Sequence, residues 1–335
     1  MSDMRRGRVI MLTGASAGVG RAVARQLARE EGARLGLLAR GEDGLEATRR
    51  EVEHLGGEAL VLPADVAEPE AVEEAASALE ERFGPIDVWI NNAMVTVFAP
   101  VWEVTAAEYT RVTKVTYLGV VHGTQAALER MRPRNAGRIV QVGSALAYRA
   151  IPLQSAYCAA KHAVQGFTEA LRTELMHEAS DIKVTMVQLP AVNTPQFGWL
   201  RSRLPKRPQP VPPIFQPEVA ADAIVYAARH DQRELFVGGS ALKAIWGNKL
   251  APWLADRVLA KNGFESQQTD EPEIPGRADN LYAPIPGDHG AHGRFDARAR
   301  SVSLELWARK NRGLLAAGAA GLLAGVVGLF AAGRG

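Results

Sequence analysis

Three residues suited to proton transfer stand close together near the middle of the chain. Ser144 follows a short apolar run, and Tyr157 and Lys161 come thirteen and seventeen residues later. The i,i+4 spacing of Tyr157 and Lys161 places both side chains on one face of a helix. A neighbouring ammonium stabilises a phenolate by up to about 4 kcal/mol at ~4 Å and an effective dielectric of ~20, so the pair predicts a lowered pKa for Tyr157. Tyr157 would then exchange a proton with a carbonyl or alcohol oxygen that Ser144 hydrogen-bonds.

A purely structural interpretation of these residues also exists. Tyr157 and Lys161 are compatible with a partly exposed helix face, and Ser144 with a turn. Their order relative to a glycine-rich segment near the N-terminus favours the catalytic interpretation.

That segment, TGASAGVG at residues 13–20, follows the first predicted strand and opens the first predicted helix. Glycines there allow a tight turn and a close approach of backbone amides to a pyrophosphate at the helix N-terminus. A plain strand-to-helix turn is the alternative, because three glycines alone are weakly specific. The residues expected to form this phosphate site are Gly14, Ser16, Gly18, Val19 and Gly20.

The residue that follows the second predicted strand indicates which nicotinamide cofactor is used. An enzyme that uses NAD places an acidic residue there for the ribose 2′-hydroxyl, whereas this chain has Ala39 and Arg40. A guanidinium binds a 2′-phosphate, so Arg40 predicts NADP(H), with a solvated surface arginine as the alternative. Asp65, after the third strand, is either an acceptor that faces the adenine or the N-cap of the next helix.

The elements that position these residues alternate between short β-branched or leucine-rich runs and longer helical stretches, from residue 8 to about residue 239. Nearly continuous apolar strands joined through helices predict an α/β fold with a doubly wound parallel sheet, in which ligands bind at the carboxyl ends of the strands. The predicted strands are residues 9–12, 34–38, 59–62, 88–91, 138–142, 183–188 and 234–237. The predicted helices include residues 21–31, 45–55, 69–82, 106–131, 157–178 and 251–260.

Composition excludes several classes of protein. The 335 residues carry a net charge of only +2 and no basic block interleaved with aromatic residues, so no nucleic-acid partner is expected. The single cysteine, Cys158, excludes an intramolecular disulfide and a cysteine-based zinc site, and favours a reducing compartment. His289 and His292 lie in a glycine-rich stretch without a third well-placed ligand, so we expect no metal site.

The composition along the chain predicts a division into three parts. Residues 1–245 would form the nucleotide-binding domain, residues 246–312 an extension with a polar tether at 267–300, and residues 313–335 a hydrophobic helix. Residues 314–332 carry no charge and would span ~28 Å as a helix, near the ~30 Å of a bilayer core. The positive-inside rule then leaves the large domain in the cytoplasm. The alternative is a helix that docks on this protein or on a partner subunit.

Residues 195–217 predict the character of the substrate. This segment holds seven prolines, four large apolar residues and four basic residues. Beside a membrane anchor, an apolar and basic lid suggests a lipophilic ketone or alcohol. The same residues would also suit contact with lipid headgroups or a neighbouring subunit.

Taken together, these motifs resemble the short-chain dehydrogenase/reductase superfamily over about residues 8–240. The resemblance implies a Rossmann fold, a nicotinamide cofactor and frequent assembly into dimers or tetramers, so a homo-oligomer is expected. It also implies that Tyr157 is the catalytic acid/base, that Lys161 binds the nicotinamide ribose and tunes Tyr157, and that Ser144 orients the substrate. The motifs that carry it are TGASAGVG, Asn91-Asn92-Ala93, Ser144 and Tyr157-Cys158-Ala159-Ala160-Lys161, and the further cofactor ligands that it implies are Val66, Asn92, Val192 and Thr194.

Three positions depart from the family pattern. Thr116 stands where the family usually has an asparagine for proton relay, so its hydroxyl is the expected relay group. Met94 replaces a glycine and would line the pocket or pack into the core. Leu189 and Pro190 stand where Pro-Gly is usual.

The sequence therefore predicts an oxidoreductase that transfers a hydride between NADP(H) and a carbonyl or secondary alcohol, with Ser144, Tyr157, Lys161 and Thr116 as the catalytic set. The alternatives are a nucleotide-binding sensor whose catalysis has lapsed and a membrane scaffold subunit.

Overall fold

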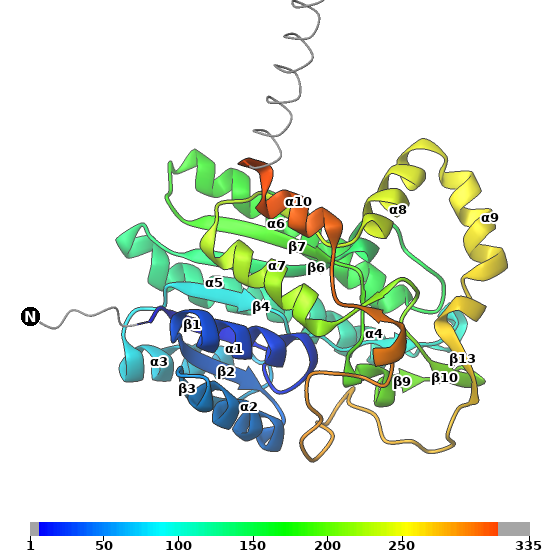
Figure 1. Cartoon of the computed structure of the whole chain (residues 1–335), viewed down its shortest axis with the longest axis horizontal. Helices are drawn as coiled ribbons and strands as arrows, with labels where there is room; N and C mark the ends of the chain where they lie inside the picture. Colours follow the sequence, from blue (N-terminus) through cyan, green and yellow to red (C-terminus); the bar gives the residue numbers. More distant parts are fainter. Residues whose placement is uncertain (1–6, 314–335) are drawn as a thin grey trace, which may run out of the picture.

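The computed structural model of the chain describes residues 7–313, apart from the side chains of residues 240–244. Its centre is a seven-stranded sheet in which all neighbours pair in parallel (Figure 1). All seven predicted strands lie in this sheet, so the doubly wound fold is confirmed. In spatial order the strands are β12 (Glu234–Phe236), β7 (Lys183–Leu189), β6 (Arg138–Ser144), β4 (Val88–Asn91), β1 (Val9–Thr13), β2 (Arg34–Ala39) and β3 (Glu58–Pro63).

The order of the strands places a crevice beside β1. From β1 the chain builds outward through β2 and β3, and it then returns to add β4, β6, β7 and β12 on the other side. In doubly wound sheets this reversal opens a binding crevice at the carboxyl ends of the strands.

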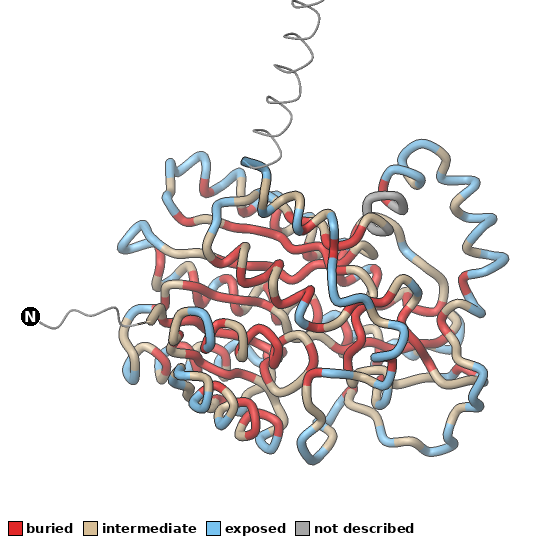
Figure 2. Tube along the Cα trace, in the orientation of Figure 1, coloured by how far each residue is buried: buried red, intermediate tan, exposed pale blue. Residues whose placement is uncertain are grey.

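Helices cover both faces of the sheet and bury a separate hydrophobic cluster on each (Figure 2). Leu27, Leu45 and Ile224 belong to the cluster on one face, and Val72, Val112 and Leu171 to the cluster on the other. The first layer contains α1 (Gly18–Glu31), α2 (Glu42–His54) and α7 (Pro217–Arg229), and the second contains α3 (Pro69–Phe83), α4 (Ala106–Thr113), α5 (Gly119–Met131) and α6 (Ser155–His177).

Local sequence explains where these helices begin and end. α1 ends at Gly32, whose left-handed backbone (φ 55°) suits glycine. Pro69 occupies the first position of α3, where its missing N–H costs nothing. Thr105 and Glu108 form a reciprocal capping box at the start of α4.

One predicted helix, residues 106–131, is interrupted in the structure. A π-helical turn, η2 (Lys114–Leu118), separates α4 from α5. Thr116 lies in this turn, where its side chain is bonded to the backbone of Val95. The helical periodicity of the sequence does not indicate such a turn. π turns occur frequently beside functional sites.

Residues 267–300 do not form the tether that their polar composition predicts. Leu281 is fully buried and Phe295 nearly so. The segment contributes β13 (Gln268–Pro272), which pairs with β10 (Lys206–Pro208), and β14 (Ala299–Arg300), which joins β8 (Ala191–Val192) through β11 (Ile214–Phe215). The prediction was wrong because a few buried apolar residues and many backbone hydrogen bonds hold the segment, and neither appears in its average polarity. A further short pair joins β5 (Val97–Phe98) to β9 (Arg201–Ser202).

Three helices complete the description. The predicted helix at 251–260 is present as α9 (Pro252–Asn262), and α8 (Gly239–Leu250), which was not predicted, precedes it; α10 (Leu304–Lys310) packs near β12. Within residues 7–313, no helix combines the length and apolar character needed to cross a bilayer. The span predicted at residues 314–332 lies outside the described residues.

Candidate active site

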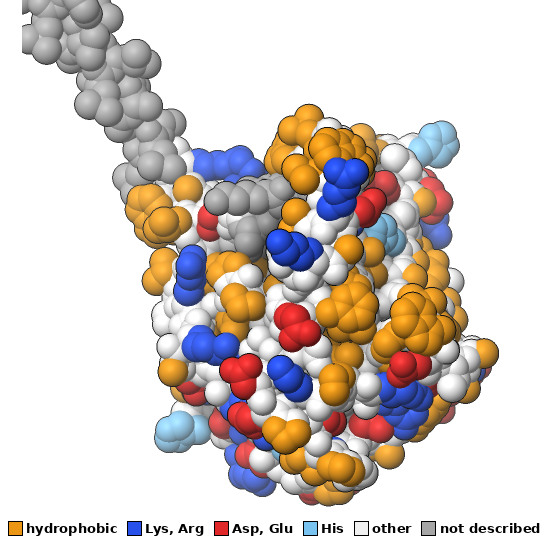
Figure 3. Space-filling view, turned by 90° about the vertical axis from the view of Figure 1, so that its right-hand side faces the viewer, with side chains coloured by type: hydrophobic (Ala, Val, Ile, Leu, Met, Phe, Trp, Pro, Cys, Tyr) orange, Lys and Arg blue, Asp and Glu red, His pale blue; other side chains and the backbone are white. Residues whose placement is uncertain are grey.

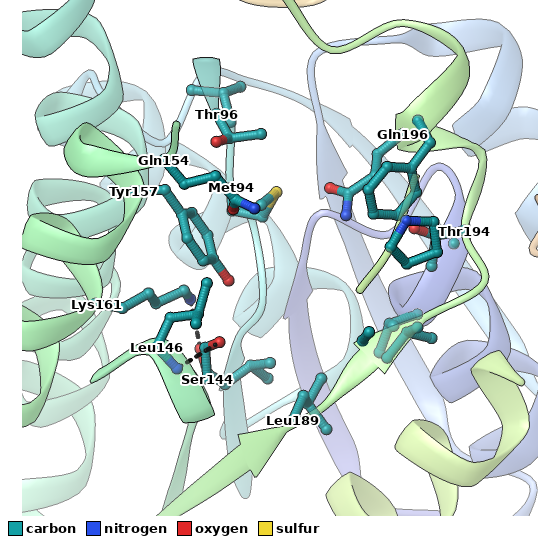
Figure 4. A pocket seen from close by; sticks show the side chains of 18 of the residues that line it. Met94, Thr96, Ser144, Leu146, Gln154, Tyr157, Lys161, Leu189, Thr194 and Gln196 are labelled. Carbon is teal, nitrogen blue, oxygen red and sulfur yellow. Dashed lines mark hydrogen bonds between the residues drawn. The ribbon is translucent and has the colours of Figure 1, made fainter. Parts of the chain in front are cut away.

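A cavity of about 780 Å³ lies at the carboxyl ends of the central strands and holds most of the predicted site residues. One end is lined by the glycine-rich turn between β1 and α1, and the other by the apolar residues of α8 and α9. Ser144, Tyr157 and Lys161 lie on one wall, and Thr194 and Gln196 on the facing wall (Figure 4). The two predicted residues that do not line the cavity are Gly20 and Thr116.

The predicted catalytic trio comes together from two elements. Ser144 is the last residue of β6, while Tyr157 and Lys161 lie in the first turns of α6. The Lys161 Nζ donates to the Val142 carbonyl at 2.6 Å, and the Ser144 Oγ accepts from the Leu146 amide at 3.2 Å. The Tyr157 hydroxyl points toward Ser144 (Figure 4). The Lys161 Nζ lies 5.7 Å from the centre of the Tyr157 ring.

Burial controls the ionisation of the two titratable groups. Burial raises the pKa of Tyr157, and a hydrogen bond with Ser144 acts in the opposite direction. Burial lowers the pKa of Lys161 to about 8. The lowered pKa of Tyr157 predicted from its ammonium neighbour is therefore not what this structure gives, because loss of hydration raises the pKa and Lys161 does not contribute to it. The protein alone favours the neutral phenol, which is a proton donor.

Thr116 is fully buried and its hydroxyl is committed to the backbone. It donates to the Val95 carbonyl at 2.9 Å and accepts from the Val95 amide at 3.1 Å. A hydroxyl has one proton to donate, so this pairing leaves none for the cavity. Thr116 therefore fixes the backbone of the segment after β4, and this geometry does not support its expected role as a proton relay.

The glycine-rich turn has the backbone geometry that a phosphate site needs. Gly14 and Gly18 have φ angles of 70° and 57°, which side chains rarely permit. A Cβ on Gly20 would lie 2.1 Å from the Gly14 carbonyl oxygen, so only glycine lets α1 approach the turn. The Gly18 amide donates to the Gly290 carbonyl at 3.1 Å, whereas the Val19 and Gly20 amides have no acceptor within the helix, and Ser16 and Val19 line this end of the cavity.

Asn92 fixes this turn from the neighbouring strand. Its side-chain amide donates to the Thr13 carbonyl at 3.0 Å and the Gly14 carbonyl at 3.2 Å. Its backbone amide donates to the Thr13 hydroxyl at 2.9 Å. Asn92 also lines the cavity, so it holds the turn in place beside the ligand space.

Arg40 and Asp65 line the same end of the cavity as the glycine turn. Arg40 donates to the carbonyls of Asn280 and Leu281, and among the described residues it forms no ion pair. Asp65 pairs with Arg111 and accepts from the Ala67 amide at 3.0 Å. Asp65 therefore stabilises the turn before α3 and is not the N-cap of that helix, because the N-cap is Glu68.

Val66 lies on the same wall, where its carbonyl accepts from the His122 Nδ1 at 2.9 Å and its side chain packs against Gly119. As a carbonyl it can only accept, so the His122 Nδ1 carries the proton in this contact. The side chain of Val66 is nearly buried and lines the cavity.

The wall opposite the trio contains Val192 and Thr194, and both are nearly buried. The Thr194 Oγ1 is buried and has no hydrogen-bond partner among the described residues. A buried hydroxyl without a partner is costly, so its presence in a cavity wall indicates a polar ligand group. Leu189 and Pro190 lie on the same wall beside β8.

Sequence reasoning missed several residues of the cavity. Thr96, Gln154 and Gln196 line it, and the Thr96 Oγ1 is buried without a partner among the described residues. Gln154 immediately precedes α6, three residues before Tyr157, and this helix-entry position is the one indication that the sequence offered. Met94 lines the cavity and is only partly buried, so it is a wall residue rather than a core residue.

Residues of the proline-rich segment 195–217 line the cavity, and ion pairs hold the segment. Glu108, which is buried, pairs with Arg201 at 3.0 Å and with Arg203 at 2.6 Å. These contacts lower the pKa of Glu108 to about 2 against the effect of burial. Phe197 and Trp199 from the same segment line the cavity.

The two histidines considered for a metal have other partners. His292 contacts Asp296 and Glu218, each at 2.9 Å, and His289 packs edge-on against Trp199 with ring centres 4.4 Å apart. Within the described residues no group of three possible ligands has the geometry of a metal site.

The family model for short chain dehydrogenases matches residues 8–204 of this sequence. The chain belongs to that family. This dehydrogenase is 34% identical over 95% of its length to an uncharacterized oxidoreductase, YxnA, of Bacillus subtilis (strain 168), and the match covers 89% of that protein.

Two solved structures of similar fold come from named enzymes. Levodione reductase aligns with a TM-score of 0.61 and 28% identity over 70% of this chain and 98% of its own. An alcohol dehydrogenase from Thermococcus sibiricus, complexed with 5-hydroxy-NADP, aligns with a TM-score of 0.59 and 28% identity over 69% of this chain and 95% of its own. The dehydrogenase is thus an oxidoreductase of the hydride-transfer class that uses a nicotinamide cofactor and a small-molecule substrate.

Proposed function

We propose that this dehydrogenase transfers a hydride between NADP(H) and a lipophilic carbonyl compound or secondary alcohol. The observation that carries the proposal is that one cavity contains the glycine-rich turn, Arg40 and the Ser144, Tyr157 and Lys161 trio. A dinucleotide at one end and a substrate at the other would meet at the Tyr157 hydroxyl.

The preference for NADP(H) rests on the charge at the end of β2. Arg40 is a half-buried cation in the cavity wall, and its hydrogen bonds in this structure go to neutral carbonyl oxygens. Two of its five N–H groups serve those carbonyls, which leaves three for an anion. A 2′-phosphate would supply the missing negative charge.

The residues present also suit the remainder of the cofactor. The Val19 and Gly20 amides at the start of α1, which have no acceptor within the helix, would hold the pyrophosphate, and Thr194 would pair its orphaned hydroxyl with the carboxamide. Lys161 would hold the nicotinamide ribose through its remaining N–H groups. NADP(H), when bound, donates or accepts the hydride.

The chain's own residues supply the acid–base chemistry. Ser144 would hydrogen-bond the substrate oxygen, and the neutral Tyr157 phenol would donate its proton to that oxygen as the carbonyl is reduced. Because burial favours the protonated phenol, we propose reduction as the direction in which Tyr157 acts first as a proton donor. In the oxidative direction Tyr157 must accept the proton, and a charged Lys161 would then stabilise its anion.

Apolar lining supports a lipophilic substrate. Beyond the trio the cavity is bounded by Phe98, Leu146, Ile151, Phe197 and Leu254. Figure 3 shows the face of the molecule on that side, where hydrophobic side chains gather next to lysines and arginines. Leu250, Trp253 and Leu254 of α8 and α9 are among the exposed apolar residues.

The enzymatic part of the proposal is tested with purified protein, NADPH and a panel of lipophilic ketones and aldehydes. Tyr157→Phe should reduce kcat by a factor of about 10² to 10⁴ while NADPH still binds. Tyr148→Phe is the matched control, because Tyr148 bonds to Glu234 and does not line the cavity. Tight NADPH binding without turnover of any substrate would instead indicate a nucleotide-binding sensor.

The cofactor preference is tested with Arg40→Asp, for which the ratio of NADPH to NADH affinity is the informative quantity. The substitution also removes contacts to the carbonyls of Asn280 and Leu281, but that loss affects both nucleotides alike. We expect the ratio to shift toward NADH. An unchanged ratio would remove Arg40 from the 2′-phosphate site.

We also propose that residues 314–332 anchor the protein in a membrane, with residues 1–245 as the catalytic domain on the cytoplasmic side. The support is a run of 19 residues without charge. Deletion of residues 313–335 should move the protein from the membrane fraction to the supernatant and preserve NADPH binding. Full-length protein found in the supernatant would refute the anchor. Assembly into a homo-oligomer stays a prediction.

A further inference from the structure

A segment of the C-terminal extension crosses the nucleotide end of the cavity. Residues 280–293, here called the strap, run beside α1 and α2 after the chain leaves β13 (Figure 1). Strap residues line the same cavity as the glycine-rich turn and Arg40. Any ligand that fills this end of the cavity therefore lies between the turn and the strap. The cavity-lining strap residues are Asn280, Pro284, Ile285, Gly287 and His289.

The strap is bonded directly to the elements expected to hold the dinucleotide. The Gly290 carbonyl accepts from the Gly18 amide of the glycine-rich turn at 3.1 Å. The Gly287 amide donates to the Asp43 carboxylate at 2.7 Å, at the start of α2. Arg40 donates to the Leu281 carbonyl at 3.3 Å. These three bonds attach the strap to the turns that follow β1 and β2.

An ion pair fastens the strap to the helix behind the turn. The side chain of Arg21, in α1, is only 5% exposed and lies between Glu51 of α2 and Asp288 of the strap. A second contact joins the Arg21 guanidinium to the other Asp288 oxygen at 3.2 Å. Asp288 itself is about half exposed, so its replacement disturbs no packed core.

Asn280 adds an unsatisfied polar atom at this end of the cavity. Its Oδ1 is buried and has no hydrogen-bond partner among the described residues. Its backbone is fixed on both sides, because its amide donates to the Trp199 carbonyl at 3.0 Å and its carbonyl accepts from Arg40. A buried acceptor held in this way needs a donor, such as a ribose hydroxyl or the adenine amine.

We propose that the strap covers the bound dinucleotide and slows its release, with Arg21–Asp288 as the latch and the Asn280 side chain as a further ligand. This inference rests on the proposed function, because it takes the cavity ligand to be NADP(H). Release of a ligand held between the turn and the strap requires the contacts to Gly18, Asp43 and Arg21 to break.

The latch is tested by stopped-flow measurement of NADPH dissociation from the full-length protein. Asp288→Ala should raise the dissociation rate constant about fivefold, which corresponds to the ~1 kcal/mol expected of a partly exposed ion pair. Glu271→Gln is the matched control, because Glu271 lies in the same extension, forms ion pairs with Arg207 and Arg294, and does not line the cavity. The control should release NADPH at the wild-type rate.

The outcomes separate the strap from the proposed function. Wild-type protein that binds no NADPH overturns both. Wild-type protein that binds NADPH, together with an Asp288→Ala variant that releases it at the unchanged rate, overturns the latch and leaves the proposed function intact. Thermal melting of the protein without nucleotide checks that both variants fold.

The side-chain ligand has its own test. Asn280→Ala should raise the NADPH dissociation constant about fivefold, as the loss of one hydrogen bond predicts. It should leave the melting temperature of the nucleotide-free protein unchanged, because the orphaned oxygen contributes no bond there. An unchanged dissociation constant would remove Asn280 from the site.

Discussion

Replacement of Lys161 by methionine should stabilise the nucleotide-free protein while it abolishes activity. Burial lowers the pKa of Lys161 from 10.5 to about 8. Each unit of pKa corresponds to about 1.4 kcal/mol, so the buried ammonium costs about 3 kcal/mol of folding free energy at pH 7. Methionine has a similar length and no charge, but it loses the 2.6 Å hydrogen bond to the Val142 carbonyl, at a cost of about 1 kcal/mol. The expected net gain is about 2 kcal/mol.

The sign of the pH dependence makes this prediction specific. Between pH 8 and pH 10.5 the unfolded chain keeps the Lys161 proton while the folded protein releases it, so wild-type stability recovers as pH rises through that range. At pH 9.5 the remaining cost is about 1.4 kcal/mol, and the advantage of the methionine variant should nearly disappear. Below pH 8 the advantage should be constant.

Urea unfolding at pH 7 and pH 9.5 measures both quantities. Lys114→Met, which changes an exposed lysine, is the matched control and should show no comparable gain. A Lys161→Met variant that is less stable than wild type at pH 7 would refute the reasoning, because it would mean that the buried ammonium is fully compensated by its surroundings. The same variant should reduce NADPH-dependent turnover by a factor of about 10² or more.

Three further predictions follow from single sites. Glu108→Gln should destabilise the lid by about 2 kcal/mol at pH 7, because it removes the charge that pairs with Arg201 and Arg203. The difference from wild type should vanish as pH falls from 4.5 toward 2, because the pKa of Glu108 is lowered to about 2 and its carboxylate is protonated there. Urea titrations at several pH values measure this difference. Cys158 is buried, and burial raises the pKa of its thiol to about 11, so a thiol-specific chromogenic reagent at pH 8 should react only after unfolding. Gly20→Ala should abolish dinucleotide binding, because the added Cβ would clash with the Gly14 carbonyl. Gly166→Ala is the control and should leave binding unchanged, because a Cβ there has no atom within 4 Å. Calorimetric titration with the dinucleotide measures both variants.

The central sheet was predictable because its inner strands are buried on both faces. Runs such as residues 9–12 and 88–90 are continuously apolar, and the glycine or polar residues that bound them leave little choice of register. The interruption of residues 106–131 was not predictable, because the π turn depends on a bond from Thr116 to Val95, twenty-one residues earlier. Periodicity reports on contacts within a helix and carries no information about such distant partners.

The identities of the site residues were predictable, but their ionisation was not. Spacing placed Tyr157 and Lys161 on one helix face, and the structure has them on the same wall of the cavity as Ser144 (Figure 4). The predicted attraction between phenolate and ammonium assumed a partly hydrated pair. Both groups are instead buried, and in a buried pair the loss of hydration acts on each charge separately.

The strap was missed for a related reason. Its sequence is rich in proline, glycine and aspartate, which is the composition of a tether, and its attachments are mostly backbone groups that any sequence could offer. Three of the attachments have an arginine at the other end: Arg21, Arg40 and Arg111 each contact the strap from the nucleotide-binding domain. Arginines that form such bonds lie more than 160 residues away from their strap partners in the chain, so only the folded structure reveals that the extension and the cofactor site are one unit.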